Sequence, residues 1–297
     1  MRNFEMFLNA IEYQGKVENE VFPEPFYPCF QGAWYYKVLS SHDSWLGFEG
    51  VLTLPEFEPD ENRFEEVDDP KFPNGKVKKY LDTPSVYVGG SSDFETDIGF
   101  GWFHGIVNDR ISTEKITFRP FWRTIFVEDG KEKNVYLGTP IEATEYYFFP
   151  GDQLKIQLIC EEDNYLSFIV TLLNPTKNTN YSEKRALCKP NQRLYISKIK
   201  APGNGIHSST YKRVNAIDQY HNEGKPTQNT NAMAKGSIWE SVYLYREINQ
   251  RLVKVPFTSN RFTQMKCPNA RAFMIENTDH QEIVSINPKN VLERNCL

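Results

Sequence analysis

The chain has 297 residues and a formal net charge of -5 at pH 7. Nucleic-acid-binding domains are usually basic, so this charge argues against a nucleic-acid partner. Aromatic residues reach 14% of the chain. This content suits the pleated, half-buried surfaces of β-sheets, and it also suits surfaces that stack on sugar rings.

The first residues do not follow the pattern of an export signal or a membrane span. Glu5 and Asn9 fall where a signal peptide would be apolar, and no apolar run of about 18 residues occurs. The cysteines form no CxxC or Cys/His zinc pattern and are widely spaced: Cys29, Cys160, Cys188, Cys267 and Cys296. We therefore expect reduced thiols, a cytoplasmic location, no membrane contact, no metal and no cofactor.

Residues 1–45 are predicted to form an N-terminal extension that begins with one short helix. Phe4, Phe7, Leu8 and Ile11 recur at the i, i+3, i+4, i+7 spacing of an amphipathic helix. Packing of this helix on the domain and docking of a partner both remain open.

Beyond an acidic, proline-rich surface loop at 58–75, the pattern is mostly that of strands. Strand-like segments separated by Gly, Asn, Asp or Pro turns are 85–90, 93–103, 115–127, 134–138, 145–149, 153–160, 165–173, 237–248, 251–257, 260–265, 271–277 and 282–287. Closely spaced strands without helical periodicity indicate a sandwich or a barrel. Segments 153–160 and 165–173 are predicted to pair as a hairpin. Residues 211–234 are polar, with few large apolar groups, and we expect a long ordered loop there.

The segment DFETDIGFGWF (93–103) places two acids in a strand that is otherwise apolar, aromatic or glycine. Strand alternation puts Glu95, Asp97, Gly99 and Gly101 on one face, opposite a core face of apolar residues. Glycines in a strand often mark a close approach by a ligand or another backbone. This face is therefore a candidate floor of a binding groove.

The next strand places Arg119 and Arg123 on one face, where they would lie across from Glu95 and Asp97 if the two strands are neighbours. Two interpretations remain open. The charges pair across a solvated sheet at about 0–1 kcal/mol each, or the acids lie in a cleft where Glu95 acts as a general acid or base. Glu95 and Asp97 match only part of the ExDxE signature of laminarinase-type sandwich enzymes, in which two carboxylates cleave a glycoside.

Alternation in the segment 237–248 puts Trp239, Tyr243 and Tyr245 on one face and Glu240 on the other, among aliphatic residues. This predicts either an exposed aromatic row that stacks on a ligand or a row covered by the loop 211–234. His104 follows the acid strand, but HxxxH and HExxH are absent. GxSxG, a P-loop and a strand-linked GxGxxG are absent too.

Several segments together resemble the glutamic (eqolisin) peptidases, a family within the concanavalin-like sandwich superfamily. GVLTLP (50–55) is similar to the family's Gly-x-x-x-x-Pro strand, and ETDIGF (95–100) to its Q-[TA]-G-V-D-F strand, with Glu95 in the place of the catalytic glutamine. FPGDQLKI (149–156) matches a turn before a strand, and SIWESVY (237–243) resembles the A-E-W-I-V-E strand, in which only Glu240 lies near the positions of the glutamates. The resemblance spans about residues 46–266 and implies the fold rather than the activity, because the catalytic glutamine and glutamates are replaced or displaced.

We therefore predict an all-β, concanavalin-like jelly-roll sandwich of two antiparallel sheets with a short N-terminal helix, formed as one domain by residues 1–297. The leading functional hypothesis is a module that binds a glycan or an extended chain such as a peptide. The proposed contact residues are Asp97, Arg119, Arg123, Trp239 and Tyr243. One alternative is a divergent peptidase or glycan-cleaving hydrolase with Glu95 and Glu240 as catalytic residues. Another is a structural protein that self-associates. Whether the protein is an enzyme is left open.

Overall fold

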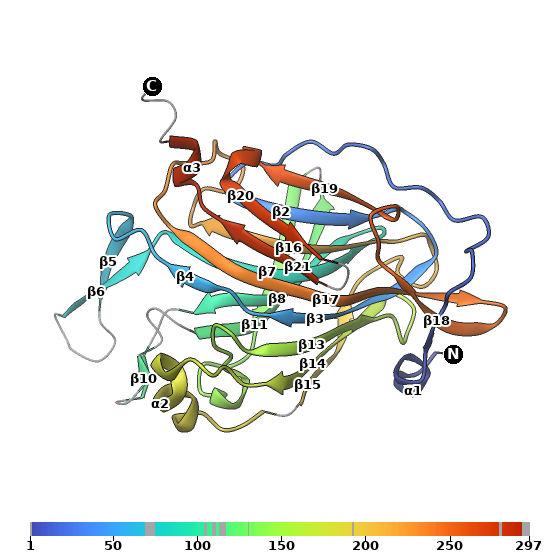
Figure 1. Cartoon of the computed structure of the whole chain (residues 1–297), viewed down its shortest axis with the longest axis horizontal. Helices are drawn as coiled ribbons and strands as arrows, with labels where there is room; N and C mark the ends of the chain where they lie inside the picture. Colours follow the sequence, from blue (N-terminus) through green and yellow to red (C-terminus); the bar gives the residue numbers. More distant parts are fainter. Residues whose placement is uncertain are drawn as a thin grey trace.

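The computed structural model describes residues 2–68, 75–103, 106–108, 111–112, 117–129, 131–191, 193–278 and 281–292. Within these residues, two large β-sheets pack face to face, with the ten-stranded sheet in front in the view of Figure 1. All the pairings inside the large sheets are antiparallel except that of the two-residue strand β1 with β18. This confirms the predicted all-β sandwich.

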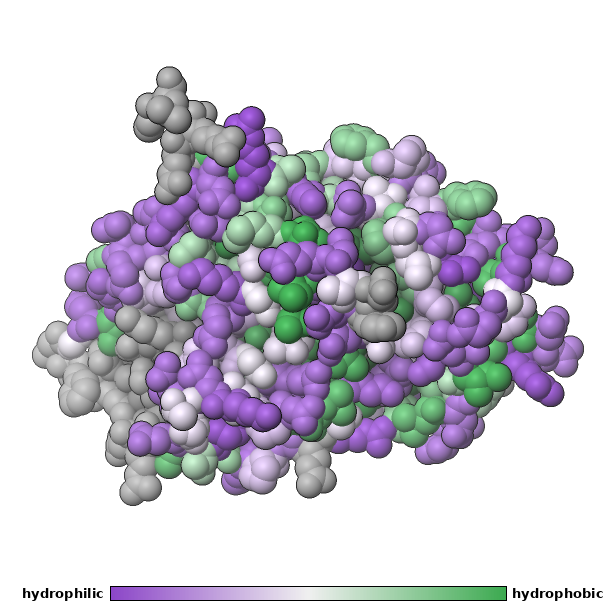
Figure 2. Space-filling model, in the orientation of Figure 1, coloured by the Kyte–Doolittle hydropathy of each residue, from purple (hydrophilic) through white to green (hydrophobic). Residues whose placement is uncertain are grey.

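The ten-stranded sheet has β3 and β17 near its middle and β15 at one edge. Its strands are β1 (Ile11–Glu12), β18 (Arg251–Pro256), β17 (Met233–Ile248), β3 (Trp45–Thr53), β13 (Gln153–Ile159), β14 (Tyr165–Asn174) and β15 (Arg193–Lys200), in spatial order. Three more strands complete this sheet: β4 (Glu56–Glu58) and β21 (Gln281–Ile286) pair with β17, and β20 (Phe273–Asn277) pairs with β21. The outer face of this sheet is mostly hydrophilic, with separate hydrophobic groups (Figure 2).

The seven-stranded sheet lies behind in this view. Its spatial order is β12 (Lys131–Gly138), β11 (Thr117–Glu128), β8 (Glu95–Phe103), β7 (Asp82–Ser91), β16 (Thr210–Gln219), β2 (Ala33–Ser40) and β19 (Phe262–Cys267). Two small hairpins, β5 (Phe64–Asp68) with β6 (Lys76–Tyr80) and β9 (Ile106–Asn108) with β10 (Ile111–Ser112), complete the described strands.

The main hydrophobic core lies between the two sheets and takes side chains from both. The predicted hairpin is confirmed as β13 and β14, in which Ile156 pairs with Val170 and Leu158 with Phe168. These residues pack with Ile98 of the other sheet in a single buried cluster. The two-residue alternation of the sequence suffices to predict the hairpin of β13 and β14, because each strand has one apolar face.

The helices are short and lie at the periphery. They are α1 (Phe4–Leu8), α2 (Thr179–Leu187), α3 (Lys289–Leu292) and the 3-10 turns η1 (Thr144–Tyr146) and η2 (Ala270–Ala272). Asn3 caps α1 by accepting a hydrogen bond from the Met6 amide. Phe7 of α1 is buried against the ring of Tyr245, so α1 packs on the outer face of the ten-stranded sheet, while Ile11 lies beyond the helix in β1. None of the helices in the described part of the chain is long and apolar enough to cross a membrane.

Two predicted boundaries were wrong. The expected extension 1–45 contains β2, and the expected loop 211–234 begins with β16, an interior strand of the seven-stranded sheet. Polar residues obscured the alternation of β16. Arg213 pairs with Glu282 at 2.5 Å, and Asn215 accepts a hydrogen bond from the Trp239 indole. Polar side chains of a buried strand are stable when they have such partners, and these partners come from distant segments.

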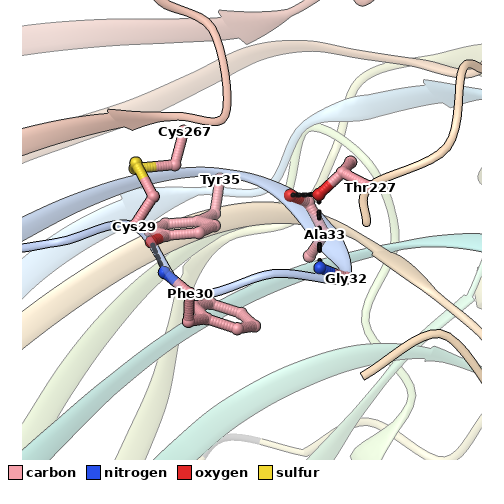
Figure 3. Close-up of a disulfide and its surroundings, with 7 residues drawn as sticks. All are labelled: Cys29, Phe30, Gly32, Ala33, Tyr35, Thr227 and Cys267. Carbon is pink, nitrogen blue, oxygen red and sulfur yellow. Dashed lines mark hydrogen bonds between the residues drawn. A yellow bond between two sulfur atoms is a disulfide. The ribbon is translucent and has the colours of Figure 1, made fainter. Parts of the chain in front are cut away.

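The expectation that the cysteines are reduced is wrong for one pair, because Cys29 and Cys267 form a disulfide (Figure 3). Cys267 is the last residue of β19 and lies across from Tyr35 of β2, on whose ring Phe30 stacks. The bond therefore fastens the N-terminal segment to the edge of the sheet. Cys160 and Cys188 are buried free thiols, and Cys296 lies outside the described residues.

We predict that reduction of this disulfide lowers the free energy of unfolding by about 2–5 kcal/mol, because a link between residues 238 positions apart restricts the unfolded chain. Urea denaturation with and without a phosphine reductant measures the effect. The double variant Cys29→Ser/Cys267→Ser is the control and should not respond to the reductant. Equal stability of the wild type in both conditions would contradict the prediction.

Candidate functional site

The outer face of the seven-stranded sheet carries four charged side chains that contact one another. We call Lys37, Glu95, Asp97 and Lys212 the polar cluster. The Lys212 ammonium pairs with the Glu95 carboxylate and lies 2.5 Å from Asp97 Oδ1, while Lys37 Nζ lies 3.6 Å from Glu95 Oε1. The Lys212 side chain is 3% exposed, whereas that of Glu95 is 40% exposed. The cluster is thus anchored below the surface and accessible from outside.

A glycine on the intervening strand brings these residues together. Glu95 and Asp97 lie on β8 and Lys212 on β16, with β7 between the two strands. Gly89 of β7 pairs with Lys212, and a Cβ atom at Gly89 would come within 2.7 Å of the lysine Cε and 1.9 Å of the Thr96 carbonyl oxygen. The absence of a side chain at Gly89 therefore lets Lys212 reach across β7 to both acids.

The mutual charges fix most protonation states in the cluster. Lys212, together with Lys37, lowers the pKa of Glu95 to about 2 against the opposing effect of burial. Burial disfavours the charge of Lys212, but Asp97 and Glu95 outweigh it and raise the lysine pKa. For Lys37, burial and then the charge of Lys212 lower the pKa to about 8. Glu95 is hence an ionised acceptor, while Lys37 exchanges its proton closer to neutral pH.

The predicted bare glycine floor beside the acids is instead closely approached by the neighbouring strand β7 at Gly99 and by the ring of Phe121 at Gly101. A Cβ atom at Gly99 would lie 2.6 Å from the Tyr87 Cβ, and one at Gly101 would lie 3.5 Å from the ring of Phe121. The rings of Tyr87 and Phe121 are 6.0 Å apart between centroids, and Phe121 stacks on Tyr136 at 5.4 Å. Tyr87, Phe121 and Tyr136 form what we call the aromatic row, whose outermost ring, Tyr136, is 60% exposed.

The two predicted arginines lie on the same face, since β8 and β11 are neighbours as expected. Arg123 is across from Asp97 in the register, and its guanidinium pairs with Glu223 at 2.9 Å. Arg119 donates to the Thr139 carbonyl and lies over the ring of Tyr147. Of the two predicted acids, Glu95 is the more exposed, and it is paired with lysines, which were not among the predicted partners.

A further carboxyl group on this face has an altered proton affinity. Asp218 of β16 accepts a hydrogen bond of 2.5 Å from the Ser85 hydroxyl of β7. Burial, followed by the charges of Asp97 and Glu223, raises the pKa of Asp218 to about 6, although Ser85 acts in the opposite direction. Asp218 therefore changes its charge closer to neutral pH than an ordinary aspartate does.

The predicted second patch on β17 does not join this site. Its register shifts between Glu240 and Tyr243, where Ser241 has a φ of 49°, so the alternation reverses at this bulge. Trp239 consequently faces the core and is 1% exposed, which contradicts its predicted place in an exposed row with Tyr243. Glu240 accepts a hydrogen bond from Gln153.

Tyr243 points outward from the ten-stranded sheet, where its hydroxyl donates to Glu12. Glu95 of β8 and Glu240 of β17 belong to different sheets, so the structure does not bring these two predicted residues together on one sheet face.

Sequence reasoning missed Lys37, Lys212, Tyr87 and Tyr136. Lys37 carried a signal, because it is the one charged residue in the apolar run AWYYKVLS (33–40), and lysines are rarely buried without a partner. The other three lacked such a signal.

Metal ligation has no support among the described residues, which contain no group of three His, Cys, Asp or Glu side chains able to hold an ion. His104, which follows the acid strand, lies outside the described residues.

No protein-family model and no curated protein matches the sequence. Among solved structures, scytalido-glutamic peptidase bound to a transition-state analog inhibitor aligns with 87% of this chain and 100% of its own, at 9% identity and a TM-score of 0.47. SCP-B, a member of the eqolisin family of peptidases, aligns with 86% of this chain and 98% of its own, at 7% identity and a TM-score of 0.40. Both are peptidases of the kind that the sequence resembles.

The bulge in β17 predicts losses of stability of different size for two aromatic residues four positions apart. Trp239→Ala should lower the free energy of unfolding by about 3–5 kcal/mol, because it empties a core site and removes the indole donor to Asn215. Tyr243→Ala should cost less than about 1.5 kcal/mol, the range of one partly exposed hydrogen bond. Chemical denaturation measures both, and a larger loss for Tyr243→Ala would show that the alternation continues through Ser241.

The polar cluster predicts a pH-dependent contribution to stability. The pKa of Glu95 is lowered from its ordinary 4.5 to about 2 by Lys212 and Lys37, so its stabilising effect is complete above pH 4.5 and disappears as the pH falls towards 2. Glu95→Gln should therefore be less stable than the wild type at neutral pH and approach it near pH 2. Urea denaturation across this range measures the difference. Glu240→Gln, which alters a carboxylate bound to a neutral amide, is the matched control. A deficit for Glu95→Gln that stays constant down to pH 2 would contradict the role of the lysines.

Proposed function

We propose that this protein binds a glycan across the outer face of the seven-stranded sheet. The observation that supports this proposal is the aromatic row, in which the ring of Tyr87 lies 5.8 Å from Lys212 Nζ of the polar cluster and the ring of Tyr136, at the other end, is exposed. Sugar rings present apolar C–H faces, which stack on aromatic rings, and hydroxyl groups, which bind carboxylates and ammonium groups. Both kinds of contact are available on one face.

The charges of the polar cluster favour a neutral or weakly charged glycan. Two carboxylates, Glu95 and Asp97, face two ammonium groups, Lys37 and Lys212, so the cluster has no strong net charge. Because the four groups already hold one another in place, a hydroxyl group meets fixed donors and acceptors, which lowers the entropic cost of binding.

Binding fits the cluster better than hydrolysis with Glu95 as the proton donor. A general acid needs a pKa near the working pH, and the lysines hold the pKa of Glu95 at about 2. Trp239 is too deeply buried to stack on a ligand, and Tyr136, the exposed ring of the aromatic row, takes the stacking role in this proposal.

The disulfide bears on the location of this binding. Disulfides persist mainly in oxidising compartments, so the bond between Cys29 and Cys267 favours a secreted or otherwise oxidising location over the cytoplasm. Extracellular glycans are accessible to a protein in such a location.

We predict that Tyr136→Ala weakens glycan binding about two- to twelvefold, because stacking on one aromatic ring contributes about 0.5–1.5 kcal/mol. A microarray of neutral and uronic-acid-containing oligosaccharides selects the probe, and isothermal titration calorimetry measures its dissociation constant. Tyr195→Ala is the matched control, since Tyr195 is a similarly exposed tyrosine on the other sheet. Failure of every oligosaccharide to bind, or equal losses in both variants, would overturn the proposal.

A further inference from the structure

A pocket separate from the polar cluster opens where the edges of the two sheets face each other. Its volume is about 450 Å³, within the range of about 300–1,000 Å³ that is typical of small-molecule sites. Its lining comes from β11 and β12 of the seven-stranded sheet, from β15 of the ten-stranded sheet and from the residue before β8. The lining residues are Phe94, Trp122, Thr124, Phe126, Val127, Val135, Leu137, Lys198, Ile199 and Lys200.

Strand alternation on β11 and β12 makes the walls of this pocket apolar. Trp122 pairs with Leu137 and Thr124 with Val135, so these four side chains share the inner face of the sheet. Tyr136 belongs to the opposite face of β12 and to the aromatic row. The pocket and the proposed glycan site are therefore on different faces of the same sheet edge.

One hydrogen bond crosses between the two sheets at the pocket, and several of its apolar lining residues are exposed. The Thr124 hydroxyl donates to the Lys200 carbonyl at 2.8 Å and joins the two sheets there. At the mouth, Val127 is 69% exposed, and Val135 and Leu137 are each 51% exposed. Exposed apolar side chains that gather around a concavity are more often part of a binding site than of an ordinary protein surface.

The charged residues of the lining are both cationic. Lys198 and Lys200 contribute to the pocket, and none of its described lining residues is acidic. Lys198 Nζ lies 3.9 Å from a Glu162 carboxylate oxygen, at the outer limit of an ion pair, and both side chains are exposed. Among the described contacts, Lys200 makes no ion pair. The described charged residues of the lining are thus both cationic, and Lys200 also presents its backbone carbonyl to Thr124 there.

We propose that this pocket binds a free fatty acid, with the hydrocarbon chain among the apolar walls and the carboxylate beside Lys198 and Lys200. An unbranched chain suits a cavity between two sheet edges, and the lysines complement the charge of the head group. This site is independent of the proposed glycan site and uses none of its residues.

Calorimetric titration with octanoate, decanoate and dodecanoate, each kept below its micelle concentration, tests the proposal. Each added methylene group should tighten binding about fourfold, as expected from the burial of hydrocarbon. Decanoate should bind at least about fivefold more tightly than 1-decanol, because only the acid pairs with lysine. The variant Lys200→Gln should reduce this preference.

Leu137→Glu, which places a carboxylate at the mouth, should weaken the binding of dodecanoate at least about tenfold. Met274→Glu is the matched control, since Met274 is a similarly exposed apolar residue on β20. Tyr136→Ala should leave fatty acid binding unchanged, which separates this site from the glycan site. Absence of saturable binding, equal affinity for acid and alcohol, or wild-type affinity in Leu137→Glu would overturn the proposal.

Discussion

The burial of one lysine determines the arrangement of the outer face of the seven-stranded sheet. Lys212 lies on an interior strand with 3% of its side chain exposed, and its charge is balanced by Glu95 and Asp97 of β8. Removal of one partner from a buried ion pair typically costs about 3–5 kcal/mol, because the other charge is left uncompensated. Burial of the Lys212 charge therefore requires three features together: the strand order β8-β7-β16, the glycine at position 89 and the two acids.

This dependence explains why the acids lie in a strand that is otherwise apolar. The two acids neutralise the ammonium group of Lys212, which reaches them from β16. Lys212 lies 117 residues after Glu95 in the chain. The same pairing leaves Glu95 charged and partly exposed, so it is available to a ligand as an acceptor. Beside it, Gly99 and Gly101 make room for Tyr87 and Phe121 of the aromatic row. A structural requirement of the sheet thus produces a surface with both charged and aromatic groups.

The sequence predicts the strands with one continuous apolar face, and it fails where a local or distant event alters the pattern. Alternation predicts the hairpin of 153–160 with 165–173, and the structure pairs these segments in regular register from Leu154 to Ile159. Alternation also predicts which face of β8 carries Glu95. The pairing of β8 with β11, with Arg123 across from Asp97, was considered as well. Trp239 was misplaced because a single bulge at Ser241 exchanges the two faces of β17.

Other failures have a different physical cause. The strand β16 was missed because its polar residues, such as Arg213 and Asn215, have partners that only the folded chain supplies. The disulfide was missed because Cys29 and Cys267 become neighbours only when β19 pairs with β2. Contacts between segments far apart in sequence leave no periodic signal, and both the polar cluster and the aromatic row consist of such contacts.

The most direct test of the central claim is a crystal structure of the protein with the oligosaccharide that binds it best. The account predicts that a sugar ring lies on Tyr136 and that hydroxyl groups contact Glu95 or Lys37 of the polar cluster. Electron density for the oligosaccharide on the ten-stranded sheet, with the polar cluster and the aromatic row free of ligand, would contradict it.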